Sequence, residues 1–457
     1  MQMAVINRRL YGMDEKSGEK EDYRIIETKR NTEPFQIEEV TEQVILAGVS
    51  FQENDDTEAS LLELAELAET AGAKVLGSVI QSREHIHPGT YLGTGKLQEL
   101  RQMAAELGAT GIVCDDELSP AQLRNMEQEL ECKVMDRTLL ILDIFAARAS
   151  TSEGKIQVEL AQLKYRMTRL TGLGLSLSRL GGGIGTRGPG EKKLEMDRRL
   201  IKNRIAQLNR ELKQVKKHRE INRGQREKNR MKVAAIVGYT NAGKSTLLNR
   251  LTHASVLEED KLFATLDPTT RSLKLESGQE VLLTDTVGFI RKLPHHLIQA
   301  FGSTLEEAKY ADIIIHVIDA SNPQWEKQMQ IVYETLEHLG VSGKKRITLW
   351  NKQDKVTEKE LFKDPQADRM FQISAKTGEG LKEFLEALEE ILREDKQLLE
   401  GIFSYEKGNR ISAIRKYGEL LQEEYREEGI YVKAYVPAEL YPNLEVDMSK
   451  IREQGLQ

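Results

Sequence analysis

Several features of extracellular and membrane proteins are missing from this sequence. It has only two cysteines, Cys114 and Cys132, and their spacing is not that of a metal site, which argues against a disulfide framework or a zinc cluster. No run of about 18 uncharged apolar residues is present, and residues 1–20 lack the apolar core of a signal peptide. We therefore expect a cytoplasmic protein in which both cysteines are ordinary core residues.

The chain is too long for a single domain and too acidic for a uniformly basic nucleic-acid binder. Its 457 residues exceed what one hydrophobic core supports, so three or four domains are expected. Hydrophobic residues make up 39% and charged residues 30%, as in soluble globular proteins. The net charge of −7 still leaves room for a local basic patch. A monomer is the simplest expectation.

A phosphate-binding loop stands near the middle of the chain. Residues 233–249 read VAAIVGYTNAGKSTLLN, which is an apolar run, a loop and an amphipathic run. The loop matches G-x-x-x-x-G-K-S, with Gly238, Gly243, Lys244 and Ser245 at the fixed positions. Small residues let successive backbone N–H groups converge on a phosphate at a helix N-terminus, where the helix dipole favours anions. We expect Lys244 to reach the outer phosphates and Ser245 to bind Mg²⁺.

Two later segments carry residues suited to the metal and the γ-phosphate. Thr265, in LFATLDPTT, precedes a predicted strand and offers a second hydroxyl to Mg²⁺ when a γ-phosphate is present. Asp285 ends the apolar run VLLTD and is predicted to hold the metal through water. The Gly288 N–H, three residues further on, is predicted to contact the γ-phosphate. Mg²⁺ is therefore the expected cofactor.

Two further motifs predict the base. NKQD follows the strand-like run RITLW, and SAK follows the next strand. The Asp354 carboxylate can accept two N–H groups of guanine, a pattern that adenine does not offer, and the Ala375 N–H is expected to meet the guanine O6. Each motif falls at the carboxyl end of a predicted strand, where doubly wound sheets bind ligands, so GTP and GDP are the predicted ligands. The predicted nucleotide-binding residues, with Lys244, Thr265 and Gly288 as catalytic candidates, are Gly238, Tyr239, Thr240, Asn241, Ala242, Gly243, Lys244, Ser245, Phe263, Ala264, Thr265, Leu266, Asp267, Asp285, Thr286, Val287, Gly288, Asn351, Lys352, Gln353, Asp354, Ser374, Ala375 and Lys376.

One position departs from Ras-like enzymes. Phe289 follows the DTVG motif, where Ras-like proteins have a glutamine that orients the attacking water. A phenyl ring cannot do this, so we expect slow intrinsic hydrolysis that a partner accelerates. His295 and His296 begin the next predicted helix, where capping or surface roles fit them better than that of a general base.

The region before the nucleotide-binding motifs is predicted to hold two further units. Residues 43–150 alternate strand-like and helical runs, which is typical of a small parallel α/β unit. Within it, residues 85–96 carry two histidines and three glycines; a metal or phosphate site is one interpretation, and a loop between elements is the better one. Residues 151–230 show two helical stripes of apolar residues, which predict an antiparallel helix pair. Residues 1–42 are charged and aperiodic and are interpreted as a partly disordered extension.

The helix pair holds a concentration of positive charge. Its tip, residues 172–190, has eight glycines in nineteen residues, which rules out a continuous helix and favours a loop that moulds onto another surface. Residues 187–232 contain 17 lysines and arginines against 6 acidic residues, which favours contact with an RNA backbone over the alternative of a solvated helix face. The RNA-binding candidates are Arg179, Arg187, Lys192, Lys193, Lys213, Lys216 and Lys217.

The predicted architecture is therefore a multidomain α/β protein. A P-loop GTPase domain with a doubly wound, mostly parallel sheet is placed at residues 231–398. A small α/β domain follows at residues 399–457, predicted as a βαβ unit with a helix over residues 411–427.

In combination, these motifs resemble one family. GYTNAGKST, LFATLDPTTR, DTVGF, NKQD and SAK look like the motifs of the HflX family of ribosome-associated GTPases, and the GTGK turn and GGGIGTRGPGE loop are similar to its amino-terminal part. The resemblance covers most of residues 44–390. It implies binding to rRNA of the large ribosomal subunit, at the peptidyl-transferase region, and splitting or rescue of stalled ribosomes under stress.

Two alternatives of other classes stay open from the residues alone. One is a GTPase that delivers or assembles another component, such as a ribosome-assembly, membrane or metallocentre factor. The sequence has neither an amphipathic anchor nor a Cys/His cluster, which counts against the membrane and metallocentre forms. The other is a nucleotide-sensing scaffold without useful turnover, which the complete Mg²⁺ set disfavours.

Overall fold

The computed structural model describes residues 41–444 apart from short gaps. The gaps are residues 52–54, 171–188, 229–230, 253–261, 264–265, 295–296, 298–301, 357–361, 395 and 439. Residues 1–40 of the predicted extension and residues 172–188 of the glycine-rich tip lie outside the described residues. So do the predicted residues Arg179, Arg187, Ala264, Thr265, His295 and His296.

The first described unit is a parallel four-stranded sheet with helices on both faces. The strands, in the order β2-β1-β3-β4, are β1 (Gln43–Ser50), β2 (Lys74–Ser82), β3 (Gly111–Cys114) and β4 (Lys133–Asp136), and the helices are α1 (Thr57–Thr70), α2 (Thr94–Leu107), α3 (Pro120–Leu130) and α4 (Arg137–Arg148). Alternate residues of β1 enter different cores: Leu46 packs with α1 and α4, whereas Ala47 packs with α2 and α3. Cys114 is fully buried in the second core, as predicted for it.

Two elements of this unit, β4 and α4, were not predicted. The strand KVMD has only four residues, and the helix RTLLILDIFAAR is apolar on nearly all sides, so neither shows a clear period. The side chain of Asp136 accepts a hydrogen bond from the Leu139 N–H at the start of α4, which caps the helix N-terminus and fixes the turn out of the strand.

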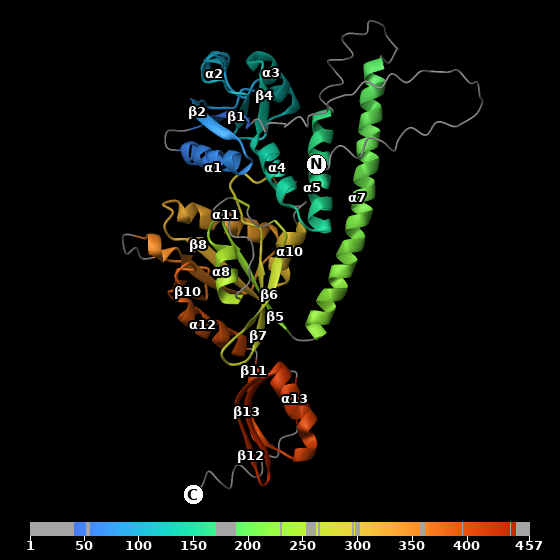
Figure 1. Cartoon of the computed structure of the whole chain (residues 1–457), viewed down its shortest axis with the longest axis vertical. Coiled ribbons are helices and arrows are strands. Elements are labelled where there is room, and N and C mark those ends of the chain that lie inside the picture. The colour runs from blue at the N-terminus through green and yellow to red at the C-terminus, as the bar shows by residue number, and fades with distance from the viewer. Residues whose placement is uncertain are drawn as a thin grey trace, which may run out of the picture. The chain divides into compact units, whose positions relative to one another are not determined.

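Two long helices follow. Helix α5 (Ser152–Leu170) and helix α7 (Pro189–Lys228) lie side by side (Figure 1). On α5, Val158, Ala161 and Tyr165 are buried. On α7, Leu208 is the only residue of the predicted apolar stripe that is fully buried. The guanidinium of Arg204 donates two hydrogen bonds to the Glu159 carboxylate, at 2.7 and 2.8 Å, and this exposed ion pair also joins the two helices.

The predicted fold class is confirmed in the central domain. Its sheet has the order β10-β9-β8-β5-β7-β6, and every neighbouring pair is parallel except β6 and β7. The strands are β5 (Lys232–Gly238), β6 (Thr269–Lys274), β7 (Glu280–Asp285), β8 (Ile313–Asp319), β9 (Lys345–Asn351) and β10 (Arg369–Gln372). The helices that pack against the sheet are α8 (Lys244–Thr252), α10 (Gly302–Tyr310), α11 (Trp325–His338) and α12 (Leu381–Arg393).

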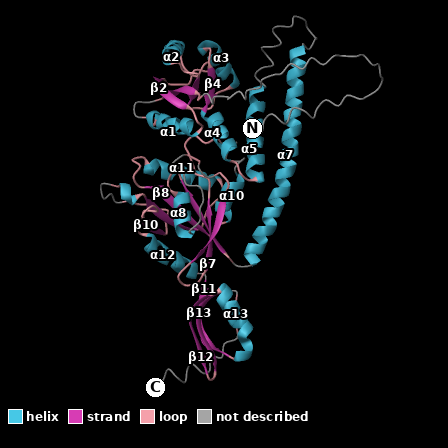
Figure 2. Cartoon of the chain, in the orientation of Figure 1, coloured by secondary structure: helices cyan, strands magenta, loops and turns pink. Residues whose placement is uncertain are grey.

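The last unit corrects the prediction of a βαβ element. It is an antiparallel sheet with the order β11-β13-β12 and one helix, α13 (Figure 2). The bounds are β11 (Lys396–Phe403), α13 (Gly408–Tyr417), β12 (Glu419–Arg426) and β13 (Gly429–Pro437). The predicted helix over residues 411–427 is wrong beyond Tyr417, because Gly418 has an extended backbone and the chain then pairs with β13. A Cβ at Gly418 would lie 2.8 Å from two carbonyl oxygens, so glycine is required at this sharp end.

Candidate functional site

The phosphate loop lies between β5 and α8, and its two glycines are fixed by close neighbours. Gly238, with φ of +156°, would place a Cβ 2.2 Å from the carbonyl oxygen of Val317 on the adjacent strand. Gly243, with φ of +94°, would place one 2.3 Å from Nδ2 of Asn351. Any side chain at either position would clash, so both glycines are needed to bring the loop against β8 and the NKQD motif.

Lys244 is buried at the start of α8. Only 7% of the residue is exposed, and its Nζ donates a hydrogen bond to the carbonyl oxygen of Tyr239 at 2.7 Å. Burial lowers the pKa of the ammonium to about 8, although the negative charge of Asp285 opposes this. An anion placed beside this group would therefore be strongly favoured.

The residues predicted to hold Mg²⁺ meet at the same place. Ser245 Oγ donates to Oδ2 of the fully buried Asp285 at 2.8 Å. A serine hydroxyl and a carboxylate are hard oxygen donors of the kind that Mg²⁺ prefers, with the remaining positions left for phosphate oxygens and water. This pair therefore fits the metal; Thr265, the third predicted contributor, lies outside the described residues.

The segment after β7 lies directly against the phosphate loop. The Phe289 N–H donates to the Gly238 carbonyl at 3.1 Å, and the Thr240 N–H donates to the Phe289 carbonyl at 2.8 Å. A Cβ at Gly288 would lie 2.8 Å from the Cα of Thr240 and 3.0 Å from Lys244 Nζ. Gly288 and Lys244, which the sequence assigns to the same phosphate, are thus close neighbours.

The two base-recognition motifs also meet. Asn351 Nδ2 donates to the Ala242 carbonyl at 2.8 Å, and Asn351 Oδ1 accepts from the Ala375 N–H at 2.9 Å. Ser374 Oγ donates to Asp354 Oδ1 at 2.7 Å, which lowers the pKa of that carboxyl and keeps it ionised. The phosphate loop, NKQD and SAK therefore form one connected constellation.

Two predicted site residues are directed elsewhere. The ring of Phe263, a residue with φ of +55°, packs edge-on against Phe145 of α4, with ring centroids 4.6 Å apart. The Asp267 carboxylate accepts hydrogen bonds from the backbone N–H and the hydroxyl of both Ser150 and Thr151, just before α5. No sequence signal reveals this, because an Asp that binds a turn in another segment has no fixed spacing to that turn.

The RNA-binding candidates differ in their surroundings. Lys213 and Lys217 are exposed on α7. Lys216 is half-buried and lies 3.4 Å from Glu306 of α10, so part of its charge is already balanced. Lys192 and Lys193 belong to α7, but their side chains lie outside the described part of the structure.

Residues 85–93 of the predicted turn form a loop, and residues 94–96 begin α2. His87 Nδ1 lies 2.8 Å from the Thr90 hydroxyl and accepts from the Thr90 N–H at 3.2 Å, so its ring holds the turn together. Among the described residues there is no group of three or more His, Cys, Asp or Glu side chains arranged to hold a metal ion. Nor does any helix within the described ranges have the length and apolar character of a membrane span.

Comparisons with known proteins identify the family. Three family profiles match consecutive parts of the chain: "GTP-binding GTPase N-terminal" over residues 58–146, "GTP-binding GTPase Middle Region" over residues 148–226 and "50S ribosome-binding GTPase" over residues 233–352. The chain is 64% identical to the GTPase HflX of Lacrimispora saccharolytica over 413 residues, which is 90% of this chain and 98% of that protein. It belongs to the HflX family of GTPases.

More distant relatives support the same assignment. The chain is 50% identical to the GTPase HflX of Caldanaerobacter subterraneus, over 88% of this chain and 92% of that protein. It is 44% identical to the GTPase HflX of Escherichia coli, over 77% of this chain and 83% of that protein. Membership of the HflX family confirms the predicted resemblance and makes the chain a GTPase, which cleaves GTP to GDP and phosphate.

Proposed function

We propose that this HflX-family GTPase is a cytoplasmic monomer that binds the large ribosomal subunit and couples GTP binding and hydrolysis to the splitting or rescue of stalled ribosomes. The observation that carries the proposal is the joining, in one chain, of a nucleotide site to a long exposed basic helix. The family profile over the GTPase domain is described as ribosome-binding, which supports the same partner.

In this proposal the nucleotide residues have separate roles. Lys244 and the Gly288 N–H bind the γ-phosphate and stabilise the charge that develops on it during transfer to water. Asp354 and Ala375 select guanine. Ser245 and Thr265, with Asp285 through water, would hold Mg²⁺, and the metal would neutralise phosphate charge when bound.

Phe289 gives a reason why the partner is needed for fast turnover. Its ring is 1% exposed and belongs to a core that also contains Phe145 of α4, so it cannot turn toward a water molecule on the γ-phosphate. Residues that orient this water must come from elsewhere. We propose that the ribosome supplies or orders them, which makes hydrolysis slow alone and faster on the large subunit.

The basic helix and the glycine-rich loop form the RNA-facing part of the proposal. Lys213 and Lys217 are exposed on α7, so both are accessible to an RNA phosphate backbone. Residues 171–188 stand between α5 and α7 in the chain and combine dense glycine with Arg179 and Arg187. We propose that this loop contacts rRNA in the peptidyl-transferase region.

The test uses the full chain and a variant that lacks residues 173–189. Both are assayed for GTP hydrolysis with and without large subunits, for co-sedimentation with subunits in GDP or a non-hydrolysable GTP analogue, and for ribosome splitting by light scattering. We expect the deletion to keep GTP binding and basal hydrolysis but to lose splitting, because the loop is remote in sequence from Lys244 and Asp285. Full ribosome splitting by the deletion variant would contradict the proposal that this loop is needed for splitting.

A further inference from the structure

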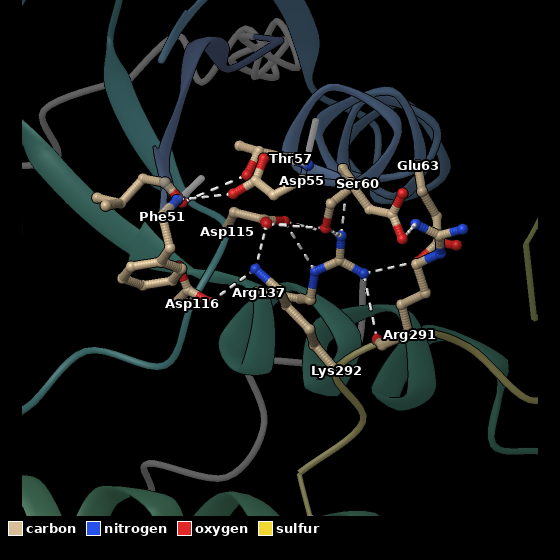
Figure 3. A network of polar contacts seen from close by, with 12 residues as sticks. Phe51, Asp55, Thr57, Ser60, Glu63, Asp115, Asp116, Arg137, Arg291 and Lys292 are labelled. Atoms are coloured by element: carbon tan, nitrogen blue, oxygen red, sulfur yellow. Dashed lines mark hydrogen bonds and ion pairs between the residues drawn. The ribbon is translucent and has the colours of Figure 1, made fainter. Parts of the chain in front are cut away.

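Figure 3 shows a buried ion network next to the carboxyl end of β3 in the first unit. Arg137 pairs with Glu63 at 2.7 Å and with Asp115 at 2.8 Å, and Lys292 pairs with Asp115 as well. The charges of this network balance one another, as those of buried ion pairs must, so the packing of the fold explains it. An ion pair in the GTPase domain differs from this network, because one of its partners belongs to the predicted nucleotide site.

The acidic partner is Asp319, the last residue of β8, which lies at the edge of the sheet where the nucleotide motifs meet. Its Oδ2 accepts a hydrogen bond from Nζ of Lys352 at 2.8 Å, and both side chains are largely buried. Its Oδ1 accepts the backbone N–H of Ser321 at 3.0 Å and the Ser321 hydroxyl at 2.6 Å. Both carboxylate oxygens are therefore engaged, and the turn after β8 fixes the direction in which Asp319 meets the lysine.

Lys352 has a backbone conformation that residues with a Cβ rarely adopt. Its φ is +63°, in the left-handed region. The chain on either side is fixed, because the Asn351 carbonyl accepts from the Ala320 N–H at 2.9 Å and the Gln353 N–H donates to the Ile373 carbonyl at 3.2 Å. Backbone strain of this kind is typical of functional sites, where it directs a side chain toward a ligand.

Lys352 stands between the residues that define the base site. The side chain of Asn351, directly before it, contacts both the phosphate loop and the Ala375 N–H. Asp354, two residues after it, is the proposed partner of the guanine edge. Four methylene groups separate the Cα of Lys352 from its ammonium, and such an apolar stem can cover a flat ring while the charged end remains paired. The ion pair with Asp319 therefore fixes the far end of a side chain that lies beside the base.

We propose that Asp319 is a positioning residue that holds the Lys352 side chain ready to cover one face of the guanine ring. The inference rests on the guanine-binding roles proposed above for Asp354 and Ala375. A free lysine side chain has many rotamers and loses them when a ligand orders it. Because the ion pair with Asp319 orders the side chain beforehand, less of this cost falls on nucleotide binding. GTP and GDP have the same base, so Asp319 favours both equally and does not act on the reaction at the γ-phosphate.

The decisive variant is Asp319→Asn. Asparagine keeps the shape of the side chain and can still accept the hydrogen bonds of Ser321, but it has no charge to hold the Lys352 ammonium. We expect the affinities for a non-hydrolysable GTP analogue and for GDP, measured with fluorescent nucleotides, to fall by the same factor of about 5 to 30, which is the scale of the rotamer freedom of one lysine. In steady-state hydrolysis, KM should rise by a similar factor, whereas kcat should change less than twofold.

A ligand without a base shows whether the loss is confined to the base site. Inorganic triphosphate with Mg²⁺ can occupy the phosphate loop but has no ring for Lys352 to cover. Its inhibition constant against GTP hydrolysis should be the same for Asp319→Asn and for the unchanged chain.

A double-mutant cycle tests whether Asp319 acts through the lysine. Lys352→Met keeps an unbranched apolar stem but removes the ammonium, so it should weaken GTP and GDP binding to about the same extent as Asp319→Asn. Once Asp319 has lost its partner, Asp319→Asn should cause no further loss. The double variant should therefore bind both nucleotides like either single variant.

The control is Asp312→Asn. Asp312 stands directly before β8, at the opposite end of the strand from Asp319. Its carboxylate likewise pairs with a lysine, Lys232, at 3.2 Å and accepts a backbone N–H, that of Val233, at 2.9 Å. This variant removes the same kind of charge away from the nucleotide motifs and should leave both affinities unchanged. Far-ultraviolet circular dichroism and thermal melting show whether each variant is folded.

Unchanged nucleotide affinities in Asp319→Asn would overturn the inference, as would a loss confined to kcat. Triphosphate inhibition that weakens as much as GTP binding would show a general loss of the site, and additive losses in the cycle would show that Asp319 does not act through Lys352. Either result contradicts the inference. If Asp319→Asn does not fold, Lys352→Met decides alone, because full GTP affinity in that variant also overturns it. The proposed function fails separately: full GTP affinity in Asp354→Asn would show that the guanine-binding role itself is wrong.

Discussion

The buried ammonium of Lys244 makes GTP binding depend on pH in a predictable direction. Burial lowers its pKa from 10.5 to about 8, which corresponds to a cost of about 3 kcal/mol for keeping the charge in the folded protein. Negative phosphate oxygens offset that cost, so the pKa rises again when GTP binds. Above pH 8, GTP binding must therefore be accompanied by uptake of a proton, and the affinity for GTP must fall as the pH rises.

The size of the effect follows from the pKa. With a pKa near 8, about nine tenths of the free protein carries the ammonium at pH 7 and about one tenth at pH 9, so the apparent Kd for GTP should rise about tenfold between these values. The assay is a titration with a fluorescent GTP analogue from pH 6.5 to 9, together with calorimetry in buffers of different ionisation enthalpy. Proton uptake should approach one per site near pH 9.

A second lysine with the same pKa provides the control. Burial also lowers the pKa of Lys396, at the start of β11, to about 8. Lys396→Gln should leave the pH profile of nucleotide binding unchanged. A flat affinity between pH 7 and 9 in the unchanged chain, or a profile that disappears in Lys396→Gln, would refute the assignment to Lys244.

Three further perturbations test other parts of the molecule. Asp354→Asn replaces a carboxylate acceptor by an amide that presents a donor to guanine, so GTP affinity should fall by about 30- to 1,000-fold and xanthine nucleotide should bind better; unchanged binding of GTP would remove the guanine assignment. Charge reversal at Lys213 and Lys217 should flatten the slope of log affinity for large subunits against log salt, by about 0.7 to 0.9 for each RNA phosphate that is no longer neutralised, without changing GTP affinity; a salt-independent interaction would favour a solvated helix. Asp267→Ala removes four hydrogen bonds in the turn before α5 and should lower the free energy of unfolding by about 1 to 3 kcal/mol, which chemical denaturation measures.

The sequence was enough to predict that the phosphate loop, NKQD and SAK lie together, because the residues of these motifs are constrained locally. A Cβ at Gly238 would lie within 2.3 Å of the neighbouring strand, and a Cβ at Gly243 would lie 2.3 Å from Asn351, so no other residue fits either position. The phosphate-loop motif can therefore be read directly from the sequence. Strand ends of a parallel sheet converge on one edge, and this rule was enough to place NKQD and SAK beside the phosphate loop.

Other features depend on interactions between distant residues and left no local pattern. The run ELLQEEYR has helix-forming residues, yet it is β12, because pairing with β13 outweighs its weak intrinsic preference. Arg137 looks like an ordinary charged residue at a helix start, and only the fold brings it to Asp115 and to the carbonyl oxygen of Arg291. The contact of Asp267 with the turn before α5 is of the same kind, since 117 positions separate that residue from Ser150.

The burial of Phe289 limits how this enzyme can evolve. A glutamine there would supply the water-orienting amide, but it would also exchange a fully buried ring for a polar group within the core shared with α4. Losing a buried phenylalanine costs about 3 to 5 kcal/mol, a large part of the roughly 5 to 15 kcal/mol that keeps a typical domain folded. In the proposed function, where a partner accelerates hydrolysis, a faster solitary enzyme would therefore need several coordinated substitutions, and selection for speed would act on the partner instead.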